Sequence, residues 1–347
     1  MRPRVYLDWN ATTPLRPEAR AAMVAAMDVI GNPSSVHAEG RAAKSLMEKA
    51  RNQLATALGA DGADIVFTSG ATEAAALACA GRGLHCGDVE HEAVSAWCAT
   101  DLGVNAVGQV AVTGPETTAL QYANSETGIL QTLPEKLAVS DLTQAFGKLP
   151  LAFNWLGCDI GLTSAHKLGG PKGIGALILR RGLDLTAQLK GGGQEMGRRA
   201  GTENLIGIAG FAAAAEAAAR DLANGVWERV AEIRNILESA LSAAANETIS
   251  VGKDGARLPN TLCLVTPGWK GETQVMQMDL AGFAVSAGSA CSSGKVKASR
   301  VLRAMGFDEI AAASALRVSI GPDTTEDEVL RFADAWIAHY RKARARV

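Results

Sequence analysis

Apolar residues recur every three or four positions in five long segments, which is the spacing of a helix with one buried face. These segments are residues 16–27, 42–58, 205–223, 227–245 and 325–342. Short apolar and β-branched runs between them predict buried strands at residues 64–68, 106–112, 119–123, 157–164, 175–179, 261–265 and 316–320. Helices that alternate with short buried strands predict an α/β protein with a mostly parallel sheet.

Two long helical patterns meet at Asn224-Gly225, a pair of residues that favours a break between helices. We therefore expect a domain joint there, with the last third of the chain forming a separate α+β unit. Most polar candidate residues follow predicted strands. In open α/β sheets ligands collect at the carboxyl ends of the strands, so we expect the functional site there.

The chain has 347 residues, of which 48% are hydrophobic, and a formal net charge of −2. This length is sufficient for a large domain and a smaller one. The charge gives no reason to expect nucleic acid or an anionic membrane as a partner. No secretory leader and no apolar run of the ~20 residues that span a bilayer are found, so we expect a cytoplasmic protein.

The six cysteines are widely and irregularly spaced, which favours free thiols over a disulfide framework. No C-x-x-C pair is present, and we expect no metal site. Cys291 differs from the others because serines and glycines surround it and Lys295 and Lys297 follow. This setting favours a reactive thiolate, whereas Cys79, Cys98, Cys158 and Cys263 lie in helical or strand-like apolar runs.

The tetrapeptide Ser164-Ala165-His166-Lys167 ends a predicted strand and precedes a glycine-rich turn. A lysine in a partly desolvated pocket at this place can hold an aldehyde cofactor as a Schiff base. The alternative is an ordinary surface lysine before a turn. The spacing of a phosphate-binding P-loop is absent here.

Other motifs offer groups that such a cofactor needs. Thr72 opens a helix whose first N–H groups could bind a phosphate, or it could be a plain helix cap. Asp141 and Gln144 could hold a ring nitrogen and a phenolic oxygen, although Asp141 could equally cap a helix. His91 could stack on a planar ring, and Asn124 could donate hydrogen bonds; structural roles in the fold or in a turn are the alternatives.

With these pieces assembled, the chain resembles the cysteine desulfurases of the NifS/IscS type, within the fold-type I, class V aminotransferase group. The resemblance runs nearly end to end and rests on these segments in family order: YLDWNATTPLRPE, GNPSSVH, FTSGATEA, EHEAV, ANSETGILQ, SDLTQAFGK, SAHKLGGPKGIGAL, GGGQEMGRRAGTEN, LPNT, VSAGSACSSG, SRVLRAMG and LRVSIGPDTTEDE.

The resemblance implies a fold-type I architecture with pyridoxal 5′-phosphate as the cofactor. A large domain, residues 13–225, would contain a mostly parallel, seven-stranded mixed sheet between helices. A smaller α+β domain, residues 1–12 and 226–347, would carry the loop with the catalytic cysteine. Three stretches, which lie between Thr72, His91, Asn124 and Asp141, are shorter than is usual in the family.

The resemblance also implies a role for each matching position. Lys167 would carry the cofactor, Asp141 and Gln144 would contact its ring, and His91 would stack on it and act in catalysis. The phosphate group would be held by Ala71, Thr72, Ser164, His166 and, from a second subunit, Thr202. The substrate would be positioned by Asn10, Asn32, Asn124 and Arg317, the last gripping its carboxylate.

The implied reaction is removal of sulfur from L-cysteine, which gives L-alanine and a persulfide on Cys291. The implied partners are a second copy of the chain in a homodimer and a sulfur acceptor or iron–sulfur scaffold protein. The alternatives are a selenocysteine lyase, another class V lyase or transaminase, and a weakly active regulatory paralogue. A reactive thiol at Cys291 disfavours a transaminase, which has no use for it.

Overall fold

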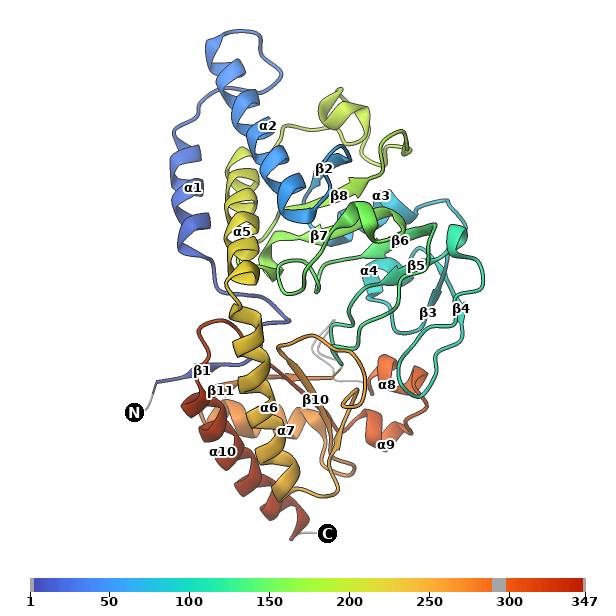
Figure 1. The fold of residues 1–347 in the computed structure, drawn as a ribbon, viewed down its shortest axis with the longest axis vertical. Helices are drawn as coiled ribbons and strands as arrows, with labels where there is room; N and C mark the ends of the chain where they lie inside the picture. The colour runs from blue at the N-terminus through green and yellow to red at the C-terminus, as the bar shows by residue number, and fades with distance from the viewer. Residues whose placement is uncertain (1–2, 289–297, 346–347) are drawn as a thin grey trace.

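The computed structural model describes residues 3–288 and 298–345 (Figure 1). Its largest sheet has the strand order β2-β8-β7-β6-β5. These strands span Asp64–Thr68, Gly175–Leu179, Cys158–Ser164, Leu137–Asp141 and Ala119–Gln121. The pairs β5–β6 and β6–β7 are parallel, while β8 runs antiparallel to both of its neighbours.

Two further strands, β3 (His85–Gly87) and β4 (Ala99–Leu102), pair in parallel beside this sheet. A bridge between His85 and Thr118 joins β3 to the segment that leads into β5. With this pair the sheet has seven strands, and within the described part of the chain only β8 opposes the others. The expected mostly parallel, mixed α/β architecture is therefore confirmed.

Alternate strand residues enter different cores because successive side chains of a strand point to opposite faces. Ile65 and Phe67 of β2 pack toward α1 (Pro17–Met27), α2 (Ala38–Leu58) and α5 (Leu205–Ala223). Val66, between them, packs on the other face against α3 (Ala71–Cys79). Helices thus cover both faces of the sheet (Figure 1). The ends of its strands, and the loops that follow them, stay accessible.

A second hydrophobic cluster surrounds an antiparallel sheet with the strand order β12-β13-β10-β9. These strands span Ser286–Ala287, Ala315–Ser319, Thr261–Val265 and Ile249–Ser250, and β1 (Val5–Tyr6) pairs in parallel with β11 (Phe283–Ala284). The cluster joins Val5 and Leu7 to residues from 227 onward. The accompanying helices are α6 (Val226–Ala244), α7 (Gly271–Leu280), α8 (Arg300–Ala304), α9 (Glu309–Ala312) and α10 (Glu326–Arg344).

Most expected elements are present with small shifts at their ends, and β2, β8, β10 and α5 have the expected bounds. The strand expected at residues 106–112 is wrong. The Asn105 side chain accepts hydrogen bonds from the N–H groups of Val107 and Gln109, and Gly108 has a φ of +80°. These features make a turn. The strand β4, which follows α4 (Glu92–Ser95), ends at Leu102, before this turn begins.

Across residues 3–288 and 298–345, no helix has both the length and the apolar composition needed to cross a membrane.

Candidate active site

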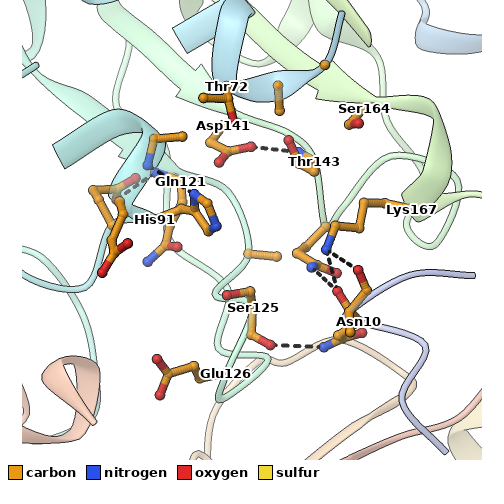
Figure 2. Close-up of a pocket in the computed structure, with 18 of the residues that line it drawn as sticks. Asn10, Thr72, His91, Gln121, Ser125, Glu126, Asp141, Thr143, Ser164 and Lys167 are labelled. Carbon is orange, nitrogen blue, oxygen red and sulfur yellow. Dashed lines mark hydrogen bonds between the residues drawn. The ribbon is translucent and has the colours of Figure 1, made fainter. Parts of the chain in front are cut away.

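A cavity of about 890 Å³ opens where the sheet, the start of α3 and the second sheet meet. Figure 2 shows Lys167 and His91 on facing walls of this cavity, with Asp141 between them and Asn10 below Lys167. The sequence-predicted residues that line it are Asn10, Ala71, Thr72, His91, Asp141, Gln144, Ser164, His166, Lys167 and Arg317. The structure therefore brings together side chains that are up to 307 positions apart in the chain.

Lys167 ends the short 3₁₀ helix Ala165–Lys167, which directly follows β7. Its Nζ donates hydrogen bonds to the backbone oxygens of Asn10 at 2.6 Å and Ala11 at 2.9 Å. Both acceptors belong to the segment that follows β1, so the amine is held by the opposite wall. This position at a strand end agrees with the general location of ligand sites in α/β sheets.

Beside this lysine, the start of α3 meets the ends of β7 and β8. The N–H groups of the first helical turn lack acceptors within the helix, so they are suited to binding an anion. Gly175 is needed here because a Cβ on it would lie 2.7 Å from the Cα of Gly70 and 2.6 Å from the oxygen of Thr163. Ala71, Thr72 and Ser164 thus surround a space that the close packing of glycines creates.

His166 borders the same space, with its Nδ1 3.1 Å from the Thr12 hydroxyl. Burial, together with the nearby positive charges of Lys167 and Lys172, lowers the pKa of His166 to about 4. The imidazole is therefore neutral near pH 7. A neutral ring can donate one hydrogen bond and accept another.

Asp141 lies at the end of β6, where its Oδ1 accepts a hydrogen bond from the N–H of Thr143 at 2.9 Å. This contact makes a turn and orients the carboxylate along the cavity wall (Figure 2). Gln144 follows, and its Nε2 donates to the backbone oxygen of Asn10 at 2.9 Å. The alternative expected for Asp141, a helix cap, is wrong because no helix follows it in this described stretch, and the turn that it makes instead is compatible with a place in the site.

His91 caps α4 and contributes to the cavity wall that faces Lys167 (Figure 2). Its Nδ1 accepts a hydrogen bond from the N–H of Ala93 at 3.1 Å, so in the neutral ring the hydrogen is on Nε2. Glu90 beside it is 1% exposed, and burial raises the pKa of its carboxyl well above the ordinary value. Glu90 is an acid that sequence analysis missed.

Arg317, in β13, brings a positive charge from the second sheet to the cavity. Its Nη2 is 2.8 Å from Asp8 Oδ1, and its Nη1 donates to the backbone oxygen of Ser125 at 3.0 Å. Its Nε is buried and has no hydrogen-bond partner among the residues described. The guanidinium is thus aimed by two contacts and retains a donor for a ligand.

Glu126 lines the cavity near the two described ends of the segment that contains Cys291. Its Oε2 accepts a hydrogen bond from the Ser299 hydroxyl at 2.6 Å, and a Cβ on Gly288 would lie 3.5 Å from the same oxygen. Burial raises the pKa of Glu126 to about 7, although Ser299, Arg317 and Arg300 oppose the shift. Sequence analysis missed Glu126 and Asp8, and only their place inside the motifs ANSETGILQ and YLDWNATTPLRPE could have indicated them.

A family model described as aminotransferase class-V matches residues 5–97 and 108–332 of this chain. The chain belongs to the aminotransferase class-V family. The expected family is confirmed. The unmatched residues 98–107 fall between His91 and Asn124, in one of the stretches that are shorter than usual.

Individual relatives agree with this assignment. A cysteine desulfurase from a Frankia species is 40% identical, covering 95% of this chain and 90% of its own. A cysteine desulfurase IscS from Dictyoglomus turgidum is 34% identical, covering 95% of this chain and 92% of its own. The solved structure of a NifS-like protein from Rickettsia africae has a TM-score of 0.88 at 30% identity, covering 97% of this chain and 99% of that one. A structure of SspA in complex with cysteine has a TM-score of 0.75 at 27% identity, covering 92% of this chain and 100% of that one.

Class-V aminotransferases of the cysteine desulfurase type work with pyridoxal phosphate, and the residues of this cavity fit that cofactor. The amine of Lys167 suits the aldehyde, the carboxylate of Asp141 suits the ring nitrogen, and the start of α3 with Ser164 suits the phosphate. The Thr143 hydroxyl, also on the wall, is buried without a partner in the described residues. The donor set thus matches a planar, anionic, aldehyde-bearing group.

Three of the predicted site residues that the structure describes do not line this cavity. Asn124 is buried below it, where its Oδ1 accepts from the N–H groups of Glu126 and Thr127 and its Nδ2 donates to the oxygen of Val89. This is the turn-forming role that we gave as the alternative. Asn32 and Thr202 are exposed on the chain away from the cavity. Cys291 lies outside the described residues.

Thr202 follows a segment that two ion pairs anchor to α2 and α3. Glu195, 5% exposed, accepts hydrogen bonds from Arg51 and from the N–H of Phe67. Arg199 pairs with Glu73 of α3 at 2.8 Å. The segment is therefore held firmly while it presents Thr202 to the outside, the position that a residue needs if it serves a second subunit.

Proposed function

We propose that the protein is a cysteine desulfurase that converts L-cysteine to L-alanine and leaves the sulfur atom on Cys291 as a persulfide. The observation that carries this proposal is the placement of Lys167, Asp141 and Arg317 in one cavity of a class-V aminotransferase. An amine, a carboxylate and a guanidinium there supply attachment of the cofactor, activation of its ring and recognition of an amino-acid carboxylate.

The cofactor, when bound, supplies an aldehyde that amines can join and a protonated ring that withdraws electrons from bonds at the substrate α-carbon. Asp141 would keep the ring nitrogen protonated, because its carboxylate stabilises positive charge. Gln144 would donate its amide hydrogen to the phenolic oxygen, and His91 would stack on the ring. Thr72, Ala71, Ser164 and neutral His166 would hold the phosphate, with Thr202 of a second subunit.

Arg317 receives the substrate carboxylate, and Asn10 fixes the floor of the substrate pocket. Asn124 supports the pocket from below, and Asn32 stays a predicted substrate residue that is exposed in this chain. Once the substrate amine has replaced it, Lys167 Nζ takes the proton from the substrate α-carbon. The amine is already positioned at this wall by Asn10 and Ala11, so little reorganisation is needed.

The sulfur step balances without an external oxidant or reductant. The Cβ–S bond of L-cysteine breaks and a bond forms between that sulfur and Cys291 Sγ. L-cysteine and the Cys291 thiol thus become L-alanine and a persulfide, with all atoms and electrons accounted for. The thiolate of Cys291 is the nucleophile because thiolates, and not thiols, attack sulfur. A further acceptor then takes the outer sulfur atom.

The proposal extends to assembly and location. We propose a homodimer in the cytoplasm that passes sulfur to an acceptor such as an iron–sulfur scaffold protein. We also propose that residues 13–225 form the cofactor unit and residues 1–12 and 226–347 the smaller unit. Separate hydrophobic clusters on either side of residue 225 support this division. The exposure of Thr202 supports the homodimer.

The test is the reaction itself. Protein purified with pyridoxal phosphate should show a visible absorption band, and L-cysteine with a reducing thiol should yield alanine and sulfide in equal amounts. Lys167→Ala should abolish turnover and change the band, because the amine that is proposed to join the aldehyde is removed. A wild-type protein that binds the cofactor but forms no alanine from L-cysteine would show that the proposed substrate is wrong.

A further inference from the structure

Lys148 is a fully buried lysine next to the active site that neither the sequence motifs nor the proposed mechanism assign to a task. It is 1% exposed and does not line the cavity. Gly147 before it has a φ of +78° and packs against α5, where a Cβ would lie 3.0 Å from Ala218 Cβ. The chain turns there, and the lysine side chain returns toward the site.

Two side-chain oxygens receive the amine of Lys148. Its Nζ is 2.7 Å from Gln144 Oε1 and 3.2 Å from Asn10 Oδ1. Within the described residues no carboxylate lies at ion-pair distance from it. Burial, with the positive charges of Lys167 and Arg317 nearby, lowers the pKa of Lys148 well below its ordinary value. The two hydrogen bonds give the amine two fixed acceptors.

The two amides are fixed in one orientation by groups of opposite kind. The Gln144 nitrogen faces the backbone oxygen of Asn10, which can only accept, and the Gln144 oxygen faces the Lys148 amine, which donates. The Asn10 side-chain oxygen likewise receives Lys148 and Asn260, while its nitrogen donates to Thr261 Oγ1 and Ser125 O. Reversing either amide would set like groups against each other.

The same Asn10 backbone oxygen accepts both Gln144 Nε2 and Lys167 Nζ. A cofactor whose phenolic oxygen receives the Gln144 nitrogen would compete with that contact. The hydrogen bond from Lys148 to Gln144 Oε1 would then keep the amide from rotating. Lys148 acts on the opposite side of the amide from the cavity, so it need not touch either cofactor or substrate.

We propose that Lys148 is a positioning residue that holds the carbonyl end of Gln144, so that the amide nitrogen faces the cofactor. The inference rests on the proposed function, because the role of Gln144 belongs to it. A side chain that orients a ligand-binding group through one contact influences the rate by keeping the reacting groups within a few tenths of an ångström. Neither Lys148 nor its contacts provide a proton to the substrate.

Two substitutions separate orientation from folding. Lys148→Met keeps most of the length of the side chain and removes its donors. Lys148→Gln has a similar length to Met and keeps a polar group, but it can turn an oxygen toward Gln144, so it removes the constraint while it leaves hydrogen bonds available. Lys342→Met, at an exposed lysine near the end of α10, is the matched control.

Both Lys148 variants should bind pyridoxal phosphate about 10-fold more weakly and lose roughly 10- to 100-fold in kcat/KM, mostly through kcat. The pH midpoint of the cofactor absorption band should also shift, whereas a purely structural change would leave the midpoint unaltered. In a Gln144→Ala background, Lys148→Gln should add less than about 3-fold, because groups that act as a unit are not additive.

The inference is overturned if both variants keep the cofactor affinity, the band midpoint and the kcat/KM of the Lys342→Met control. Independent losses in the Gln144→Ala background would overturn it too. If Lys148→Met does not fold, Lys148→Gln decides; unfolding of both would assign Lys148 a structural role only. A wild-type protein without the band or without sulfide release contradicts the proposed function instead, so the two failures are distinguishable.

Discussion

The carboxylate of Asp8 lies 2.8 Å from Nη2 of Arg317, the residue of the cavity wall that is proposed to bind the substrate carboxylate. The Arg317 side chain is 7% exposed and that of Asp8 is 17% exposed. Their segments are parallel neighbours, because Asp8 forms a bridge with Ser319. The orientation of the guanidinium therefore depends on a residue from the opposite end of the chain.

We predict that Asp8→Asn raises KM for L-cysteine by about 10-fold and changes kcat less, because the variant loosens the orientation of a group that binds substrate. Arg317→Lys should cost more, since an ammonium cannot grip a carboxylate with two parallel hydrogen bonds. Steady-state kinetics measure both, with the exposed Asp254→Asn as control. Equal KM values for Asp8→Asn and the control would remove Asp8 from this role.

Glu126 predicts a particular pH dependence of stability. Its pKa is raised from 4.5 to about 7 in the folded chain, so the folded state holds a proton that the unfolded state has lost in this range. The free energy of unfolding should therefore fall by at most ~1.4 kcal/mol per pH unit as pH rises from 4.5 to 7. His91, Arg300, Arg317 and Cys263 are the charged or titratable groups nearby.

Glu126→Gln removes this titration, so the variant should gain stability relative to wild type at pH 8 compared with pH 5. Urea unfolding at both pH values measures the difference. Glu116→Gln, at an exposed glutamate, should show no such gain. A variant whose stability follows the wild-type pH profile would show that Glu126 titrates normally.

The buried ion pair of Glu195, in the segment before Thr202, can be compared with an exposed pair elsewhere in the chain. Arg51→Leu leaves the Glu195 side chain, which is 1% exposed, without its cation and should lower the free energy of unfolding by about 3 kcal/mol. Arg220→Leu breaks the exposed pair with Glu18 and should cost less than ~1 kcal/mol. Denaturant titration gives both values. Similar losses in the two variants would mean that burial does not strengthen the first pair.

The sequence predicted the fold class and the residues that surround the cavity, for different physical reasons. Strands β2 and β8 were predictable because each is a short apolar run that is buried on both faces of the sheet. Both runs end at polar or glycine-containing turns. The strand expected at 106–112 failed because one asparagine side chain, Asn105, bonds its own backbone and favours a turn over a ladder.

Contacts between distant segments could not be predicted in this way. Lys148 and Asn10 are 138 positions apart, and Glu126 and Ser299 are 173 apart. No local pattern shows that a lysine after a glycine is buried, or that a glutamate will keep its proton. Asn124 is the opposite case. Its motif predicts a residue of the site, but its side-chain amide is used to form a turn behind the cavity wall.

The central claim is that Cys291 receives the sulfur atom of L-cysteine. The most direct test is the intact mass of the cofactor-loaded protein after one turnover without a reducing thiol, followed by peptide mapping. The account predicts a gain of one sulfur atom on the peptide that contains Cys291, with one alanine released per chain, and no gain in Cys291→Ser. Sulfur found on another cysteine, or alanine formed at the wild-type rate by Cys291→Ser, would contradict it.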